Sequence, residues 1–243
     1  MPYRRLPNTD LSRIYALKKA VEMEGYREKD VLVLSYQTTQ EAQQFLNIFE
    51  RAQRKYQQCH NLHTKSSKTY RSELTMARLY VSHFIQVLNM AIMRGELRKE
   101  IKAAYGLDTD SYNNPDLNSE TAVKEWGERI IKAEEERTSR GGVPIYNPTI
   151  AKVKVHWGVF NEHYFNQRLL RSNVASSLEE ITQLRPQADD IILDIWNQVE
   201  AFYADLPIEK KMEKCKQFGL IYYYRKSEKN RMIADQFQNS IDF

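Results

Sequence analysis

Residues 71–94 read RSELTMARLYVSHFIQVLNMAIMR and contain neither glycine nor proline. Apolar side chains recur in this stretch every three or four residues, which places them on one face of an α-helix. The stripe that they form comprises Leu74, Ala77, Tyr80, Val81, Phe84, Ile85, Leu88 and Ile92. This stripe is wide enough to be a buried face, so we predict a long amphipathic helix that ends at Gly95.

The rest of the chain is equally poor in residues that interrupt helices. Its 243 residues include only 8 Gly and 7 Pro, and neither type occurs between Tyr26 and Arg94. Elements separated by so few breakers must be long, and long elements in globular proteins are helices. We therefore predict an all-α fold, an antiparallel helical bundle, with the β-branched run Val31–Leu34 as the place for a minor short β ribbon.

Capping signals indicate where the helices before residue 71 begin. Asn8 or Thr9 can cap a first helix that runs to about Glu24. The segment Thr38–Glu41 matches a capping box, in which a Thr oxygen accepts from a free backbone N–H and the Glu reaches back. A second helix is therefore expected from that box. The polar residues 63–68 leave two alternatives open, a turn or a helix that continues through them.

Glycine and proline also divide the second half of the chain. Gly106 is a natural left-handed C-terminal stop, and a helix is expected over residues 119–139. Asn147-Pro148 resembles a cap followed by proline at the first helical position. Pro186 either kinks the helix that follows or starts the next one, because proline disfavours a helical residue before it. Pro207 opens a short last helix.

The two halves of the chain echo each other. Each ends a short helix with an aromatic residue, glycine and leucine, and HFIQV at residues 83–87 aligns with IWNQV at residues 195–199. This similarity suggests that one long-helix hairpin was duplicated. The segments expected within one compact domain are an N-terminal arm, helix and connector (1–38), a first hairpin (39–107), a linker and connecting helix (108–147), a second hairpin (148–220) and a C-terminal tail (221–243).

Several short motifs occur together in this chain. They are YRRLPNTD at residues 3–10, SHFIQVLN at 82–89, RGEL at 94–97, Trp126-Gly127, Gly141-Gly142 and NPTIA at 147–151. In this combination the chain resembles, over most of its length, a family of uncharacterised cytoplasmic proteins from Bacteroidetes. The resemblance implies a cytoplasmic protein. It implies no activity, cofactor or partner, because no activity is assigned to that family.

Compartment signals in the sequence favour the cytoplasm. The two cysteines, Cys59 and Cys215, do not make a disulfide framework, and free thiols fit a reducing compartment. The opening MPYRRLPNTD has no apolar signal-peptide core, and no stretch reaches the ~20 apolar residues of a membrane span. We expect a cytoplasmic protein without a membrane partner; a virion component made in the cytoplasm would look the same.

Motifs for catalysis and metal binding are missing from the sequence. No Glu lies three residues before any histidine, which excludes the Glu-x-x-His pattern of di-iron bundles, and neither a Gly-rich phosphate loop nor a G-x-S-x-G elbow occurs. Cys59-His60-x-x-His63 has ligand-like spacing, but a closed zinc site needs four ligands. A polar helix end with an incidental thiol is therefore favoured. We expect no catalytic residue, metal, cofactor or small-molecule substrate.

Charged and aromatic residues favour macromolecular contacts instead. The formal charge is only +4, yet residues 40–105 hold 11 basic and 5 acidic residues, whereas residues 106–140 hold 5 basic and 9 acidic ones. Tyrosine and arginine anchor protein interfaces, and they equally suit RNA stacking. The candidate interaction residues are Tyr3, Arg4, Arg5, Arg51, Arg54, Lys55, Tyr222, Tyr223, Tyr224, Arg225 and Lys226.

These observations predict a non-enzymatic helical interaction or structural protein that acts as a subunit of an oligomeric or larger assembly. Its partner would be another protein or a second copy of the chain. The alternative is an RNA- or ribosome-associated protein, because the basic residues 40–105 could track a phosphate backbone.

Overall fold

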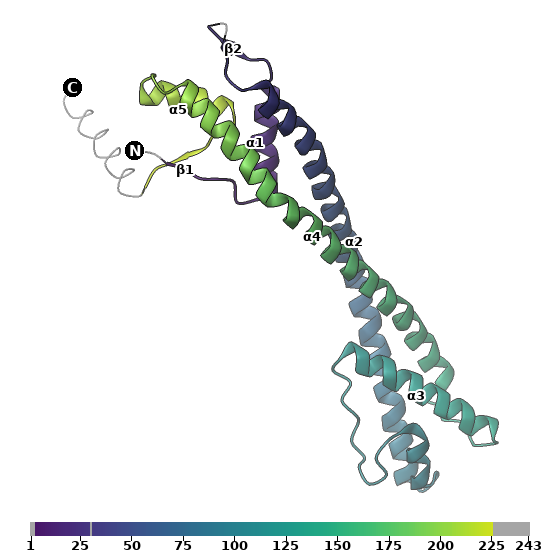
Figure 1. Ribbon diagram of the computed structural model, residues 1–243. Helices are drawn as coiled ribbons and strands as arrows, with labels where there is room; N and C mark the ends of the chain where they lie inside the picture. Colours follow the sequence, from purple (N-terminus) through teal and green to yellow (C-terminus); the bar gives the residue numbers. More distant parts are fainter. Residues whose placement is uncertain (1–2, 30, 226–243) are drawn as a thin grey trace, which may run out of the picture. The chain divides into compact units, whose positions relative to one another are not determined.

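The computed structural model describes residues 3–29 and 31–225, and it confirms the all-α prediction (Figure 1). The helices are α1 (Asp10–Glu22), α2 (Tyr36–Met93), the 3₁₀-helix η1 (Lys99–Tyr105), α3 (Glu120–Ser139), α4 (Ile150–Phe202) and α5 (Ile208–Gln217). The described strands form two antiparallel pairs, β2 (Arg27–Glu28) with β3 (Val31–Leu32) and β1 (Tyr3–Arg4) with β4 (Tyr222–Tyr223). The short ribbon expected at residues 31–34 is therefore present, in the form of β3.

The two long helices run through positions where the sequence left a break open. α2 is continuous across residues 63–68, so the alternative of a turn there is wrong. Polar side chains do not by themselves end a helix, because each backbone N–H can still reach its carbonyl four residues back. α4 likewise contains Pro186 inside one helix, and no new helix starts there.

Neither long helix is interrupted by a turn, because α2 is continuous over Tyr36–Met93 and α4 over Ile150–Phe202, so neither folds back on itself as the halves of the expected hairpins would. The chain divides into two compact units: unit 1 comprises Met1–Gln58 with Ser176–Phe243, and unit 2 comprises Cys59–Ala175. α2 and α4 each contribute to both units. Hairpins closed by local turns are replaced by pairing between two helices that are distant in sequence.

In each unit α2 and α4 run antiparallel. In unit 1, Thr38 Oγ1 donates to Asp194 Oδ2 at 2.8 Å, and Lys55 Nζ pairs with Glu180 Oε2 at 2.6 Å. In unit 2, Gln167 Nε2 donates to Ser67 Oγ at 2.6 Å, and the Tyr80 ring stacks on His156 with centroids 4.0 Å apart. Residue numbers rise along one helix as they fall along its neighbour, so the antiparallel bundle is present within each unit.

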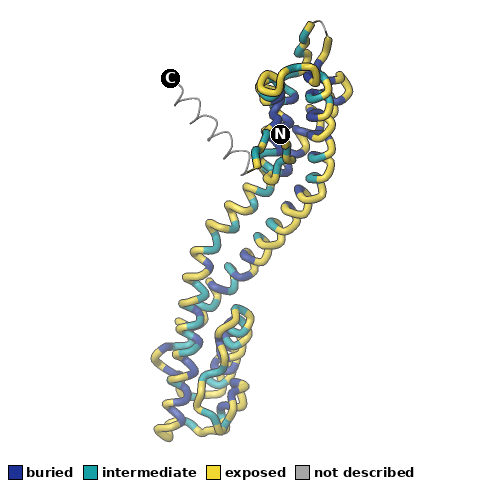
Figure 2. The backbone as a smooth tube through the Cα atoms, turned by 90° about the vertical axis from the view of Figure 1, so that its left-hand side faces the viewer, coloured by how far each residue is buried: buried dark blue, intermediate teal, exposed yellow. Residues whose placement is uncertain are grey.

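Unit 1 is built around aromatic and aliphatic side chains from four helices. Its buried residues include Leu17 on α1, Phe49 on α2, Trp196 on α4 and Cys215 on α5, together with Phe218 just after α5. Figure 2 shows buried positions, in dark blue, alternating with exposed ones along the helices, as expected for amphipathic elements. Residues near both ends of the described chain, Leu6 and Tyr222, also pack against this core.

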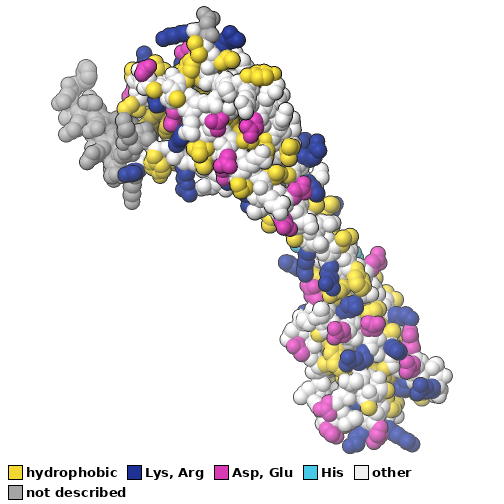
Figure 3. Space-filling model, in the orientation of Figure 1, with side chains coloured by type: hydrophobic (Ala, Val, Ile, Leu, Met, Phe, Trp, Pro, Cys, Tyr) yellow, Lys and Arg dark blue, Asp and Glu magenta, His cyan; other side chains and the backbone are white. Residues whose placement is uncertain are grey.

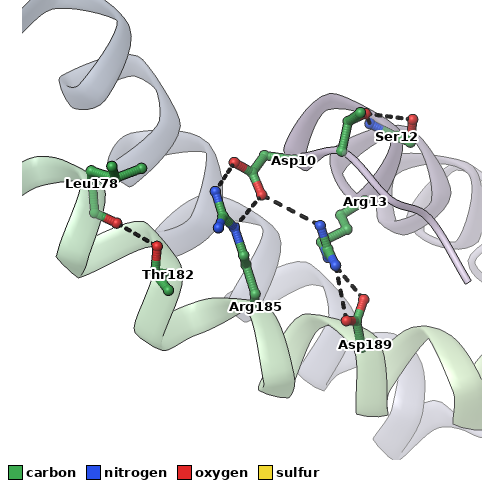
Figure 4. A network of polar contacts seen from close by, with 8 residues as sticks. Asp10, Ser12, Arg13, Leu178, Thr182, Arg185 and Asp189 are labelled. Carbon is green, nitrogen blue, oxygen red and sulfur yellow. Dashed lines mark hydrogen bonds and ion pairs between the residues drawn. The ribbon is translucent and has the colours of Figure 1, made fainter. Parts of the chain in front are cut away.

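An alternating chain of charges fixes α1 on α4 in unit 1 (Figure 4). Arg13 donates to both carboxylate oxygens of Asp189, at 2.8 and 3.0 Å, and Arg185 donates to both oxygens of Asp10, at 2.8 and 2.9 Å. Arg13 also lies 3.5 Å from Asp10 and links the two pairs. Such bidentate pairs are geometrically specific as well as charge-assisted, so the network sets how α1 lies on α4.

Unit 2 packs the second half of α2 against α3 and the first half of α4. The stripe predicted at residues 74–92 is confirmed in its core members, because Ala77, Val81, Phe84, Ile85, Leu88 and Ile92 are buried. They meet Ile130 of α3 and Phe160 of α4, among other buried residues. The helix predicted from its apolar spacing thus supplies one wall of this core.

Local capping explains where the long helices begin. α2 begins at Tyr36, two residues before the predicted capping box, because the Ser35 hydroxyl accepts from the Thr38 backbone N–H at 3.1 Å. α4 begins at Ile150, so Pro148 is not its first residue as we expected. α1 has the predicted cap, since Thr9 Oγ1 accepts from the Ser12 N–H at 3.2 Å.

The two short helices end in the same motif. Gly106 and Gly219 both adopt left-handed conformations, with φ of 69° and 84°. The N–H that follows each glycine returns to the carbonyl five residues back, from Leu107 to Lys102 at 3.0 Å and from Leu220 to Cys215 at 3.3 Å. These are Schellman-type caps. The stop predicted at Gly106 is confirmed, and the duplication itself stays a prediction.

Within residues 3–29 and 31–225, no helix combines the length and apolar character needed to cross a membrane.

Candidate interaction surfaces

The structure brings together two groups of predicted interaction residues that are far apart in sequence. β1 pairs with β4 so that Tyr3 lies opposite Tyr223 and Arg4 opposite Tyr222. We call these four residues the terminal ribbon. The ring centroids of Tyr3 and Tyr223 are 6.2 Å apart, and the two residues are 45% and 44% exposed. The ribbon thus presents an aromatic pair at the surface of unit 1.

The other two ribbon residues hold it against α4. Arg4 lies 3.1 Å from Glu200 Oε2 and donates to Asn197 Oδ1, while the Tyr222 hydroxyl donates to Glu200 Oε1 at 2.7 Å. Burial, aided by hydrogen bonds with Cys215 and Glu200, raises the pKa of Tyr222. Arg4 and Tyr222 therefore hold the ribbon on α4. Less of each side chain is available to contact a partner than we expected.

The remaining predicted residues at the chain ends lie beside the ribbon. Arg5 and Arg225 are exposed, and the Tyr224 hydroxyl lies 3.6 Å from Met212 Sδ. Lys226 lies outside the described residues. Arginine side chains thus flank the exposed aromatic pair. This combination of aromatic and cationic residues is the one from which protein or RNA contacts were predicted.

The basic residues predicted on α2 are placed on an exposed face of unit 1. Arg54 lies 4.0 Å from Glu50, and Lys55 pairs with Glu180 at 2.6 Å. Arg51 is exposed and has no ion pair among the described residues. Two of the three side chains are thus partly neutralised within the fold, as is usual for solvated helix faces.

A second basic region follows on α2 in unit 2. A pocket of about 490 Å³ is lined by one face of the helix, which we call the basic groove: His60, His63, Thr64, Ser67, Lys68 and Arg71. Neither Lys68 nor Arg71 has an ion pair among the described residues, and His63 Nε2 is buried without a hydrogen-bond partner there. In the described chain no three His, Cys, Asp or Glu side chains gather as a metal site would need, Cys59, His60 and His63 included.

The most unusual surface of unit 2 is the outward side of α4. Val155, Val159, Phe165 and Leu169 are 62%, 40%, 55% and 60% exposed. At 3.6 residues per turn they fall within about a third of the helix circumference, opposite the buried Val153, Phe160 and Tyr164. We call these four exposed residues the α4 apolar face.

The same helix provides a comparison within the chain. In unit 1 the exposed positions of α4 include the polar Glu179, Gln183 and Asp190 and also Leu193, which is 38% exposed. A surface helix ordinarily shows this division, with apolar residues toward the core and polar residues outward. The first part of α4 departs from this division at the four positions of the α4 apolar face, which surround the exposed Glu162. Figure 3 shows how charged and hydrophobic side chains are intermixed over the one surface that it draws.

A largely apolar pocket lies at the C-terminal end of α2. It has a volume of about 460 Å³, and its lining includes Val87, Ala91 and Leu97 on one side and Pro144 and Ile145 on the other. Arg94 and Glu96 form a bidentate pair at its edge, at 2.7 and 3.0 Å. The pair lowers the pKa of the Glu96 carboxyl below its ordinary value. Nothing in this lining provides a nucleophile beside a base.

Buried charges in unit 2 are committed to the fold. Glu134 is fully buried, where it accepts from Arg137 at 2.8 Å through each oxygen, from the Ile145 N–H at 3.1 Å and from the Tyr105 hydroxyl. Lys102 is also fully buried; its Nζ donates to the Ser111 carbonyl at 2.7 Å, and burial lowers its pKa. Both groups stabilise loops, through the Ile145 N–H and the Ser111 carbonyl.

Sequence analysis missed two of these features. The burial of Glu134 was not predicted, because nothing in its charged neighbours Glu135, Glu136 and Arg137 signals it. The α4 apolar face was readable in principle, since residues 155, 159, 165 and 169 repeat apolar types opposite the core stripe. Neither a protein-family model, nor a curated protein, nor a solved structure matches this chain.

Proposed function

We propose that this chain is a non-enzymatic helical subunit of an oligomeric or larger assembly, and that the α4 apolar face is covered by a protein partner there. The observation that carries the proposal is the exposure of Val155, Phe165 and Leu169 on the side of α4 that faces away from the core. Large apolar side chains that cluster in exposed positions on one side of a helix mark contact sites in proteins.

The terminal ribbon and the buried ionisable groups of unit 2 are consistent with a binding role. The terminal ribbon adds exposed Tyr3 and Tyr223 on unit 1, and aromatic residues are enriched at interfaces because they bury large areas at small entropic cost. The buried ionisable groups Glu134 and Lys102 are engaged in structural contacts. A binding role uses these features without requiring a reaction centre.

The experiment measures the native mass of the full chain by light scattering over a wide concentration range, alone and in extract from its source cells. We expect a mass above that of one chain, and a shift toward one chain in the double variant Phe165→Ser, Leu169→Ser. Leu79→Ser is the matched control, because Leu79 is 56% exposed on α2 of the same unit. A single-chain mass for the wild type under every condition would overturn the proposal.

A second candidate function, RNA binding, is favoured by the basic groove. Residues 51–72 of α2 carry six Lys or Arg side chains and no carboxylate. Lys68 and Arg71 line the groove without ion pairs among the described residues, so they could neutralise phosphates. RNA affinity should then fall with salt by about 0.7 log units per phosphate contact and tenfold change in salt.

The variant Lys68→Gln, Arg71→Gln should flatten that salt dependence, whereas Lys132→Gln on α3 should not. A gel shift that detects no RNA complex at low salt would remove this second candidate and leave the first intact.

A further inference from the structure

Every residue that lines the basic groove carries a hydrogen-bond donor in its side chain. The lining runs from His60 to Arg71 at intervals of three or one residues, so it occupies one side of α2. Imidazole, hydroxyl, ammonium and guanidinium groups all have N–H or O–H donors. Among the described residues, this lining includes no carboxylate. The groove therefore has the chemistry of an anion site.

Lys68 and Arg71 supply the positive charge of the groove. They lie three residues apart and are neighbours on the helix surface, and neither has an ion pair among the described residues. Long side chains on an α-helix lean toward its N-terminus. Both cations are therefore directed back toward Thr64 and His63.

His63 supplies a buried polar atom at that end of the groove. Its Nε2 is buried and has no hydrogen-bond partner among the described residues. The position is held by Ser67, whose hydroxyl donates to the His63 carbonyl at 2.8 Å and accepts from Gln167 on α4 at 2.6 Å. A buried polar atom without a partner costs stability. An oxyanion that accepts from Nε2–H would provide that partner.

We infer that the basic groove binds a single phosphate group, which Lys68 and Arg71 neutralise and to which His63 Nε2 donates a hydrogen bond. A phosphate monoester carries nearly two negative charges at neutral pH, so two adjacent cations match it better than they match the single charge of each phosphodiester in a nucleic-acid backbone. This site goes beyond the RNA-binding candidate and does not depend on the assembly proposed above.

Isothermal titration calorimetry of the full chain with inorganic phosphate and with pyrophosphate, at constant ionic strength, tests the site. The variant Lys68→Gln, Arg71→Gln should weaken binding about 25-fold, because each pair of unit charges at 4 Å in water contributes roughly fivefold. Lys65→Gln is the matched control, since Lys65 lies on the same helix but lines a different pocket, with Leu62 and Leu170. It should leave the affinity nearly unchanged.

His63→Leu distinguishes a defined site from a diffuse positive surface. It removes the donor and leaves both cations in place, so phosphate should bind at least about tenfold more weakly, as expected for one lost hydrogen bond to a charged group. The unliganded variant should melt no lower than wild type, because the substitution removes an unpaired buried atom. Phosphate should raise the melting temperature of wild type more than that of the variant.

The outcomes separate the phosphate site from RNA binding. Weaker binding in His63→Leu and in Lys68→Gln, Arg71→Gln, but not in Lys65→Gln, supports the site even if no RNA complex forms. Equal weakening by Lys65→Gln, or no binding of either ion at millimolar concentration, overturns it.

Two short oligoribonucleotides identify the source of the phosphate group. One that carries a terminal phosphate should displace pyrophosphate better than the same sequence with a terminal hydroxyl. If the two compete equally well, the backbone is what binds, so the site for a single phosphate group is overturned and the RNA-binding candidate stands.

Discussion

Gly127 on α3 lies directly against the indole of Trp157 on α4. A Cβ at Gly127 would come 2.9 Å from Trp157 Cγ, and closer still to Cδ1 and Nε1. The indole is fixed there, because its Nε1–H donates to the Lys124 carbonyl one turn earlier on α3 at 3.0 Å. The absence of a side chain at residue 127 therefore sets how closely α3 approaches α4 in unit 2.

Gly127→Ala should destabilise the protein even though alanine is the better helix former. The added methyl must displace a partly buried indole, and overpacking of this kind typically costs about 1–3 kcal/mol. The free energy of unfolding, from urea titration at low protein concentration, measures the effect.

Gly158→Ala is the matched control, since Gly158 also lies inside a helix but faces open space. It should stabilise the protein by about 0.5–1 kcal/mol, the ordinary preference of a helix for alanine. Equal effects of the two substitutions would contradict the close packing of Gly127 on Trp157.

Helices could be predicted from the sequence to the extent that breakers and caps are local. Gly95, Gly106 and Thr9 act within a few residues of themselves, and all three end or begin elements as expected. Ser35 was missed as the cap of α2 because Thr38 and Thr39 offered the same chemistry nearby. The side chains of Thr38 and Thr39 instead bond to Asp194 and to the Ser35 carbonyl.

Pairing between distant segments was not readable from local patterns. The polar residues 63–68 fit a turn or a solvated helix equally well, and only the contacts of α2 with α4 decide between them. The terminal ribbon is a similar case: Tyr3 and Tyr223 were each predicted as contact residues, but nothing in either segment indicates that they lie opposite each other. The α4 apolar face was overlooked because the opposite side of the helix, with Val153, Phe160 and Tyr164, is enough to make the helix amphipathic.

The pair of Arg13 and Asp189 should contribute more than a surface ion pair. The Arg13 side chain is only 10% exposed, and it donates two bonds to one carboxylate. In a double-mutant cycle with Arg13→Gln and Asp189→Asn, we expect a coupling free energy of about 1–3 kcal/mol.

The pair of Lys18 and Glu50 serves as the control, because it joins α1 to α2 at 2.6 Å but leaves the lysine half exposed. Its coupling should be about 0.2–1 kcal/mol. Indistinguishable couplings in the two cycles would mean that the network of Figure 4 adds nothing beyond surface electrostatics.

The Glu28 carboxylate should make stability depend on pH in the acid range. It accepts from the buried Tyr203 hydroxyl at 2.8 Å and lies 3.4 Å from Lys214 Nζ; the Tyr203 bond is the largest cause of its lowered pKa. A carboxyl whose pKa is lower in the folded than in the unfolded state stabilises the fold above its ordinary value of 4.5. That contribution is lost as pH falls through the folded-state pKa.

Glu28→Gln should therefore lower the melting temperature at neutral pH, and the difference from wild type should shrink as pH falls below 4.5. Glu24→Gln is the control, because the Glu24 carboxylate has no ion pair or side-chain hydrogen bond among the described residues. A difference for Glu28→Gln that stays constant with pH would show that its carboxylate gains nothing from Tyr203.

The two cysteines should differ sharply in reactivity. Cys215 is fully buried in the core of unit 1, and burial raises the pKa of its thiol, so less of the reactive thiolate forms. Cys59 on α2 is only partly buried. An aromatic disulfide reagent should label one thiol per folded chain quickly and the second at least about a hundredfold more slowly, because Cys215 must await local opening.

Two variants assign the rates to the two thiols. Cys59→Ser should retain only the slow thiol, and Cys215→Ser should retain only the fast one. Rapid labelling of Cys215 in the Cys59→Ser variant would mean that α5 does not stay packed against the core.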